Sequence, residues 1–260
     1  MNGWKSLTAS IFRRLPERVR NSLFHLGFLV APNEFHDFAH RYAGAPSMAH
    51  GLQAMARLGF EPNSVIDVGA FKGDWSRLAR CVWPRARVVM VEPNSENHAA
   101  LASVLQEPNV SLIPALLGSE DGRQVVFHVM SSGSSVMEER SSVSRAQETR
   151  TLTRLDSVLP RVDGPALLKI DAQGYELEIL KGATKIMPTV EAILLEVAII
   201  EINVGAPLLH AVTAFMADQG FVAYDILEIH RRPLDRALNQ VDIVFVRPSS
   251  PLLADKRHYA

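Results

Sequence analysis

Short apolar runs alternate with helical segments along most of the chain, and this alternation constrains the fold more than any other feature of the sequence. An apolar run at 65–68 is followed by a helical stretch at 74–82, a second run at 87–91, a second helical stretch at 95–105 and a third run at 110–117. This order predicts parallel strands joined by helices. The runs are continuous in Val, Ile and Leu because parallel strands are buried on both faces.

The second half of the chain continues the pattern. Strands are predicted at 166–170 and 190–197, with a helix at 175–187 between them. Two more strands, 221–229 and 240–247, follow each other with no intervening helix, so the last strand should be antiparallel to its neighbours. We therefore expect an α/β domain built on a mainly parallel sheet.

The middle of the chain departs from this alternation. Residues 124–130 predict an extra strand, whereas residues 131–144 contain seven serines and little apolar content. This composition is typical of an exposed loop or of a mobile lid over the site.

Composition and charge exclude several classes of protein. The formal net charge of −1 provides no global field that would draw the chain onto nucleic acid, and we expect no such partner. The single cysteine, Cys81, cannot form an internal disulfide, and no Cys/Cys or Cys/His pair has zinc-site spacing. His36 and His40 have an i, i+4 spacing that could hold a metal, but no acidic third ligand is evident. No metal ligands are therefore assigned, and a cytoplasmic protein is expected. No apolar run approaches the roughly 18–20 residues that cross a bilayer.

Residues 1–30 form a basic amphipathic segment. Apolar residues recur there at near-helical spacing, together with five basic residues: Lys5, Arg13, Arg14, Arg18 and Arg20. The segment either packs as a helical cap or contacts anionic lipid at a membrane surface. The expected organisation is an N-terminal helical extension at 1–60, the main domain at 61–250 and a tail at 251–260.

The end of the first strand carries an acid followed by a glycine turn. Asp67 stands where a dinucleotide-binding loop would have its first glycine, and Gly69 and Gly73 follow. Glycines allow the backbone to approach a ligand closely and to turn sharply. A carboxylate at this position repels phosphate and attracts a cationic ligand, which argues against a pyrophosphate-binding loop.

The second strand ends in a second acid, Glu92, followed by Pro93 and Asn94. An acidic side chain about twenty residues beyond a glycine turn can accept both hydroxyls of a ribose. An adenosine joined to an amino acid would satisfy Asp67 and Glu92 together. S-adenosylmethionine is such a molecule, and NAD is the competing cofactor.

Charged residues also gather at the end of the fourth strand. Strand alternation places Lys169 and Asp171 on one side, and Glu176 lies in the first turn of the next helix. Lys169 and Asp171 could simply pair with each other, and Glu176 could merely favour a helix N-terminus. Glu196, near the end of the fifth strand, is costly to bury unless it is paired, so it either forms an ion pair or lines the site.

These motifs resemble the FkbM family of methyltransferases. The residues that carry the resemblance are Asp67-x-Gly69-x-x-x-Gly73-Asp74, Glu92-Pro93-Asn94 and Leu168-Lys169-Ile170-Asp171-x-x-Gly174-x-Glu176-x-x-x-Leu180-Lys181-Gly182-Ala183. The resemblance implies a class I methyltransferase (Rossmann-like) fold, with a seven-stranded, mainly parallel sheet and an antiparallel last strand. It also implies methyl transfer from S-adenosylmethionine to a hydroxyl of a sugar, glycolipid or polyketide-type natural product. Phe71 and Lys72 depart from the family pattern, in which this turn usually has smaller or amide side chains.

On this hypothesis the cofactor is held along the first three strand ends. Asp67 would lie near its methionine end, Glu92 would hold the ribose and Ala115 would flank the adenine. The remaining expected contacts come from the turns after the first two strands: Gly69, Ala70, Phe71, Gly73, Pro93, Asn94 and, across the cleft, Asp171.

Methyl transfer is an in-line displacement, so the protein must position an acceptor oxygen and remove its proton. Asp171 is the first candidate for the base and Glu196 the second, while Lys169 could stabilise a developing oxyanion or keep Asp171 ionised. Glu176 completes the set of candidate catalytic residues. Asp171 with Glu196 could instead hold Mg²⁺.

Two other classes of protein compete with this interpretation. One is an enzyme that uses NAD or a nucleotide-sugar, and the other is a non-catalytic nucleotide-binding module. The missing G-x-G-x-x-G argues against the first, and the charges at the fourth strand would be unexplained in the second.

Overall fold

The computed structural model describes residues 15–130 and 133–259, and it divides into two compact units after residue 47. The first unit contains helices α2 (Glu17–Val30) and α3 (Pro32–Ala43). Three basic residues of the amphipathic segment, Lys5, Arg13 and Arg14, lie outside the described residues. Among the described helices, none has both the length and the apolar character needed to span a membrane.

The second unit is built on a seven-stranded sheet with the order β3-β2-β1-β7-β8-β10-β9. Its strands are β1 (Ser64–Val68), β2 (Arg87–Val91), β3 (Val110–Ile113), β7 (Ala166–Ile170), β8 (Val190–Ala198), β9 (Val222–Arg231) and β10 (Leu238–Val246). β10 is antiparallel to both β8 and β9, and the other pairs are parallel. The predicted class I methyltransferase fold is therefore confirmed. The strand order reverses between β1 and β7, which is where ligands bind in open α/β sheets.

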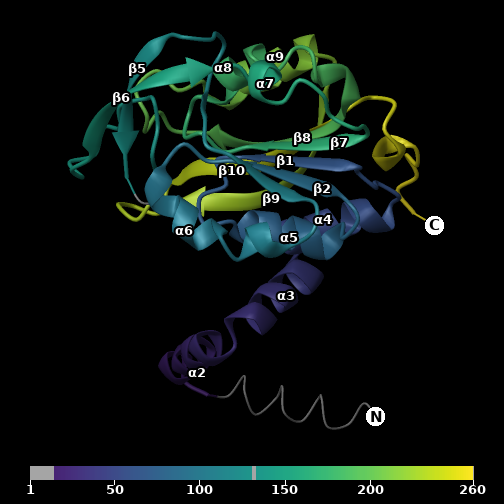
Figure 1. The fold of residues 1–260 in the computed structure, drawn as a ribbon. Helices are drawn as coiled ribbons and strands as arrows, with labels where there is room; N and C mark the ends of the chain where they lie inside the picture. The colour runs from purple at the N-terminus through teal and green to yellow at the C-terminus, as the bar shows by residue number, and fades with distance from the viewer. Residues whose placement is uncertain (1–14, 131–132, 260) are drawn as a thin grey trace. The chain divides into compact units, whose positions relative to one another are not determined.

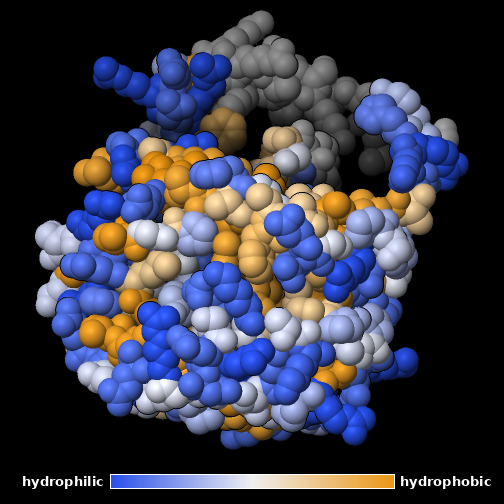
Figure 2. Space-filling view, turned by 90° about the horizontal axis from the view of Figure 1, so that it is seen from above, coloured by the Kyte–Doolittle hydropathy of each residue, from blue (hydrophilic) through white to orange (hydrophobic). Residues whose placement is uncertain are grey.

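Helices cover both faces of this sheet (Figure 1). One face carries α4 (Met48–Arg57), α5 (Asp74–Val82) and α6 (His98–Leu101), and the other carries α7 (Leu155–Val158), α8 (Glu176–Lys181) and α9 (Leu209–Asp218). Single 3₁₀ turns complete the helical elements: η1 (Ser95–Asn97), η2 (Val104–Gln106), η3 (Met187–Thr189) and η4 (Pro251–Leu253). Seen from above, the surface is mostly hydrophilic with apolar residues in patches, because the helices turn their apolar sides to the sheet (Figure 2).

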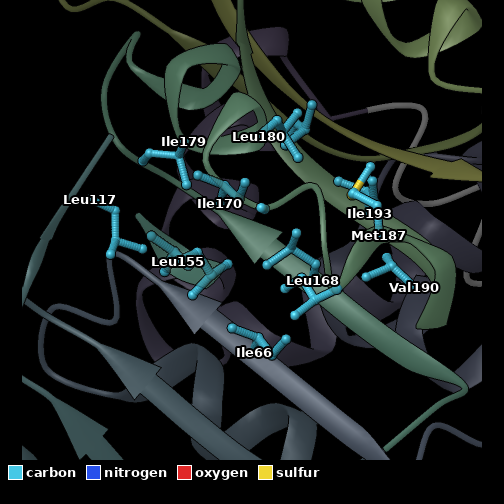
Figure 3. Packing of buried hydrophobic residues seen from close by; sticks show 14 of the residues in the cluster. Ile66, Leu117, Leu155, Leu168, Ile170, Ile179, Leu180, Met187, Val190 and Ile193 are labelled. Carbon is cyan, nitrogen blue, oxygen red and sulfur yellow. The ribbon is translucent and has the colours of Figure 1, made fainter. Parts of the chain in front are cut away.

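Strand alternation divides the core into two clusters. Ile66, Leu168 and Ile193 face α7–α9 and pack with Ile179 and Leu180 of α8 (Figure 3). The alternate residues of the same strands, Val65, Leu167 and Leu194, belong to the cluster under α4 and α5. Asp67, Lys169 and Glu196 each follow one of these alternate residues by two positions on the same strand. Their charged side chains therefore point toward the α4–α5 layer.

A smaller sheet lies beside the main one. It has the order β4-β6-β5, with β4 (Leu116–Leu117), β5 (Gln124–Val129) and β6 (Ala146–Thr153). The predicted strand at 110–117 is thus divided into β3 and β4, because Pro114 between them has no N–H for a ladder hydrogen bond. The helix predicted at 175–187 is also shorter, since α8 ends at Lys181 and Gly182 follows.

Candidate active site

A cavity of about 320 Å³ opens at the carboxyl ends of β1, β2 and β7, and we call it the strand-end cavity. Most of the predicted site residues line it: Gly69, Phe71, Glu92, Pro93, Ala115, Asp171 and Glu196. Others do not: Asp67, Ala70, Gly73, Asn94, Lys169 and Glu176. The structure also adds lining residues that the sequence did not indicate, Asn97, Phe127, Gln173 and Tyr175, and Ser135 of the serine-rich segment lies in the same wall.

Gly69 brings the ends of β1 and β7 into direct backbone contact. Its φ is +76°, and a Cβ added at this position would lie 2.0 Å from the carbonyl oxygen of Asp171. The amide of Asp171 in turn donates to the carbonyl oxygen of Val68 at 3.0 Å. Only glycine combines this backbone conformation with so close a contact. The turn therefore fixes the position of Asp171 at the rim of the cavity.

Glu92 is 5% exposed and its carboxylate receives three hydrogen bonds. The amide of Phe71 donates to Oε2 at 2.7 Å, while the amide of Asn94 and the Nδ2 atom of Asn97 donate to Oε1 at 2.8 and 3.2 Å. Burial raises the pKa of Glu92, and these hydrogen bonds partly oppose the increase. A carboxylate has about four acceptor positions, so one remains for a ligand hydroxyl.

Asp67 and Lys169 form a buried ion pair beneath the strand ends. The Nζ atom of Lys169 lies 3.0 Å from Asp67 Oδ1 and 3.5 Å from Asp171 Oδ2, and it donates to the carbonyl oxygen of Gly69 at 3.0 Å. Ser76 also donates to Asp67 at 2.6 Å. Burial acts to lower the pKa of Lys169, but Asp67 and Asp171 outweigh it and raise this pKa above its ordinary value. Lys169 therefore stays charged.

Glu176 is buried beneath the turn that follows β7. Its Oε1 atom accepts hydrogen bonds from the amides of Ala172 and Gly174, both at 3.0 Å. Burial raises the pKa of Glu176 to about 7, although these hydrogen bonds oppose the increase. In the structure this side chain holds the turn that carries Asp171.

Gln173 connects the two candidate bases. Its Nε2 atom donates to Asp171 Oδ1 at 3.1 Å and to Glu196 Oε2 at 2.6 Å, and Gln240 donates to the same Glu196 oxygen at 2.9 Å. Burial raises the pKa of Glu196 well above its ordinary value, and the charges of Asp171 and Asp242 raise it further. Glu196 is therefore harder to ionise than an exposed glutamate.

A second cavity, of about 350 Å³, lies on the α4–α5 side of the sheet, and we call it the acidic cavity. Asp171 and Glu196 line it as well as the strand-end cavity. Its other charged or titratable lining residues are Asp74, Lys169, Glu228, His230 and Asp242. His230 Nε2 lies 3.2 Å from Asp242 Oδ2. This hydrogen bond raises the pKa of His230, and burial opposes the increase.

Sequence reasoning missed His230 and Asp242. The signal was present at Asp242, which interrupts an apolar strand between Val241 and Ile243 as Glu196 does in its own strand. His230 lies near the end of a strand in which polar and apolar residues are mixed, so it carries no comparable signal.

Comparison with known proteins gives one family match. Residues 67–223 match the profile of the family described as the methyltransferase FkbM domain. No curated protein matches the sequence.

Solved structures resemble the chain at low sequence identity. The methyltransferase FkbM from Methylobacillus flagellatus KT is 17% identical with a TM-score of 0.46, over 70% of this chain and only 43% of that protein. The precorrin-6y C5,15-methyltransferase from Geobacter metallireducens GS-15 is 14% identical with a TM-score of 0.44, over 76% and 86% of the two chains. The magnesium protoporphyrin IX methyltransferase from Synechocystis PCC 6803, solved with bound S-adenosylmethionine, is 13% identical with a TM-score of 0.45, over 76% of each chain.

Proposed function

The chain belongs to the FkbM family of S-adenosylmethionine-dependent methyltransferases, and from this premise we propose that it methylates a hydroxyl oxygen of a sugar, glycolipid or polyketide-type natural product. The family match decides against the NAD-dependent and non-catalytic alternatives. The observation that carries the proposal is the position of Asp171. Its carboxylate is 36% exposed and lies at the rim shared by the strand-end cavity and the acidic cavity.

The residues around the strand-end cavity fit S-adenosylmethionine. Glu92 keeps an acceptor position for a ribose hydroxyl, Ala115 offers an apolar surface to the adenine, and Gly69 and Phe71 complete the wall. When bound, the cofactor supplies an electrophilic methyl group on a positively charged sulfur. Asp67 lies outside the cavity, bound to Ser76 and Lys169, so its contact with the methionine end stays a prediction.

Asp171 is the proposed general base. Lys169 and Gln173 lie 3.5 and 3.1 Å from its two oxygens, and these contacts fix the orientation of the carboxylate. Asp171 would accept the proton of the acceptor hydroxyl, and the bound cofactor would supply the methyl group. Glu196 is the weaker candidate, because burial raises its pKa and makes it harder to ionise than an exposed glutamate.

Magnesium at Asp171 and Glu196 also stays a prediction. The ammonium group of Lys169 lies 3.5 Å from Asp171, and its charge would oppose a cation bound at that carboxylate. Full activity in excess chelator would exclude a magnesium requirement.

We keep the expected location and organisation as proposals. These are a cytoplasmic enzyme, a catalytic domain at 61–250, a tail at 251–260 and a helical extension at 1–60 that contacts membrane. In the described part of this extension, α2 carries Arg18 and Arg20 together with exposed Leu29 and Val30. Sedimentation with anionic vesicles, compared with neutral ones, tests the membrane contact.

The proposed function is tested in two steps. Calorimetric titration with S-adenosylhomocysteine, NAD and nucleotide-sugars should give binding for the first ligand alone. Transfer of labelled methyl groups to glycan and lipid extracts then identifies the acceptor class.

Asp171→Asn should lower turnover by about 10²–10⁴-fold while the affinity for S-adenosylhomocysteine changes little. Glu178→Gln is the matched control, because Glu178 lies on α8 outside both cavities. Normal turnover in Asp171→Asn would refute the assignment of the base.

A further inference from the structure

Three carboxylates lie opposite one another across β8, β10 and β9. Asp242 of β10 is in register with Glu196 of β8 on one side and with Glu228 of β9 on the other. Like charges placed directly opposite each other destabilise a sheet. All three residues line the acidic cavity. Glu196 and Asp242 are the two partly buried members of this row, and a cation between them would offset the repulsion between their ionised forms.

The surroundings of these carboxylates are otherwise a packed core. Leu194 and Val244, two residues from Glu196 and Asp242 on the same strands, are 2% and 0% exposed in the cluster under α4 and α5. Strand alternation places the two acids on that same face. Apolar side chains at 196 and 242 would extend this core, yet the chain has two acids and a cavity there.

The ligand atoms for a metal ion are already close together. A carboxylate oxygen of Glu196, a ring nitrogen of His230 and a carboxylate oxygen of Asp242 all lie within 4.8 Å of one another. A metal ion bonds such atoms at about 2.0–2.2 Å, so two ligands of one ion lie about 3–4 Å apart. His230 Nε2 and Asp242 Oδ2, at 3.2 Å, already have this spacing.

The neighbouring groups support a bound ligand. Gln173 and Gln240 both donate to Oε2 of Glu196, and they fix its carboxylate as outer-shell donors fix metal ligands. The Nε1 atom of Trp75 is buried in the wall of the same cavity and has no acceptor within the described structure. A buried N–H without an acceptor is uncommon. An oxygen of a metal-bound water or acceptor would supply the missing partner.

In the described part of the chain, two carboxyl groups of the acidic cavity lack a Lys or Arg partner. Lys169 pairs with Asp67 and Asp171, and Asp74 pairs with Arg77 outside the cavity wall. Among the ion pairs of the described residues, Glu196 has none and Asp242 has only His230, so a cation between them would not displace a basic side chain.

We propose that Glu196, His230 and Asp242 bind one divalent first-row transition-metal ion in the acidic cavity. The imidazole nitrogen favours such an ion over Mg²⁺ or Ca²⁺, which prefer oxygen ligands. The site shares Glu196 with the magnesium pair expected from the sequence, but it replaces Asp171 by His230 and Asp242, which line the acidic cavity and not the strand-end cavity. Its role rests on the proposed function, in which the ion would bind the acceptor oxygen and lower the pKa of the hydroxyl.

Manganese is the probe, because its binding is measured without an acceptor. Mn²⁺ titrated into the metal-free full chain, followed by electron paramagnetic resonance and calorimetry, should show one bound ion per chain. His230→Gln and Asp242→Asn should each weaken binding more than about tenfold. Asp225→Asn is the matched control, because Asp225 lies on β9, is exposed and hydrogen-bonds only to the next amide among the bonds described. It should bind Mn²⁺ like the unaltered chain. Asp171→Asn, which reaches Glu196 only through Gln173, should weaken binding less than either ligand variant.

Several outcomes would overturn the site. They are no bound Mn²⁺ at millimolar concentration, equal affinity in His230→Gln and the unaltered chain, or loss of binding in Asp171→Asn alone. Circular dichroism separates loss of a ligand from loss of the fold, and the two ligand variants serve as alternatives if one does not fold. Mn²⁺ binding without methyl transfer would count against the proposed function and not against the ion site.

Discussion

Replacing Glu176 by Gln tests whether a buried charge beneath the turn that carries Asp171 weakens the protein at neutral pH. Gln has nearly the same shape, and its oxygen can still accept the hydrogen bonds that Ala172 and Gly174 donate to Oε1. The substitution therefore removes the titration of this group while it preserves the turn. It leaves Asp171 and Gln173 in place.

The magnitude follows from the pKa. Burial raises the pKa of Glu176 from 4.5 to about 7, which corresponds to about 3 kcal/mol of free energy. Between these two values the folded protein binds more protons than the unfolded chain, so the free energy of unfolding falls as the pH rises. The cost is absent below pH 4.5 and complete above pH 7. Glu176→Gln should therefore gain up to about 3 kcal/mol relative to the unaltered chain between pH 4.5 and pH 8.

The assay is urea unfolding of both proteins at several pH values across this window. The free energy of unfolding of the unaltered chain is subtracted from that of the variant at each pH. This subtraction cancels the contributions of groups that titrate in the same way in both proteins. Glu178→Gln is the control with the opposite sign, because hydrogen bonding from Lys181 lowers the pKa of Glu178. Because a lowered pKa acts mainly below 4.5, that variant should be less stable than the unaltered chain by an amount that stays nearly constant across the upper part of this window. A difference between Glu176→Gln and the unaltered chain that stays constant from pH 4.5 to pH 8 would refute the reasoning.

Two further substitutions test the packing of the strand ends. Gly69→Ala should cost about 2–4 kcal/mol in urea unfolding, because its Cβ would lie 2.0 Å from the Asp171 carbonyl oxygen. Gly122→Ala is the control, because Gly122 has a similar φ of +86° but no atom within 4 Å of an added Cβ. An equally large loss of stability in Gly122→Ala would mean that the close contact at Gly69 is unimportant. Lys169→Met should cost about 3–5 kcal/mol because it leaves Asp67 buried without its partner. A loss below about 1 kcal/mol in the same measurement would contradict that pairing.

The sheet could be predicted because its signals are local. The run at 65–68 is bounded by Gly69, and β1 is found at Ser64–Val68. The absence of a helix between 229 and 240 was enough to predict that β10 is antiparallel. Each of these inferences depends on residues within a few positions of one another.

The site was predicted less completely because it depends on distant contacts. The contact of Asp67 with the cofactor stays a prediction, and the sequence did not indicate that its carboxylate binds Ser76 and Lys169. The serine-rich stretch at 131–144 is expected to be an exposed loop or a lid, and within it Ser135 is 2% exposed and donates to the carbonyl oxygens of Ala172 and Gln173. Composition cannot indicate a contact with a turn that lies 37 residues further along the chain.

The antiparallel register explains why the acidic cavity was missed altogether. Glu196 was recognised as a costly interruption of an apolar strand, but its partner depends on which residue of β10 lies opposite. That residue is Asp242, and a shift of one position would have placed an apolar side chain there. A sequence pattern indicates that a charged residue within an apolar strand needs a partner. Only the register of the neighbouring strand identifies that partner.

One hydrogen-bonded network joins the two cavities, and this limits how single substitutions can be interpreted. It runs through Ser76, Asp67, Lys169, Asp171, Gln173, Glu196 and Gln240. Because Gln173 donates to both Asp171 and Glu196, a change at either carboxylate alters the hydrogen bonding of the other. The effects of Asp171→Asn and Glu196→Gln on turnover should therefore not add, and residues in one network typically couple by about 0.5–3 kcal/mol. The double variant, compared with both single variants, separates the role of Asp171 as a base from its role in holding Gln173.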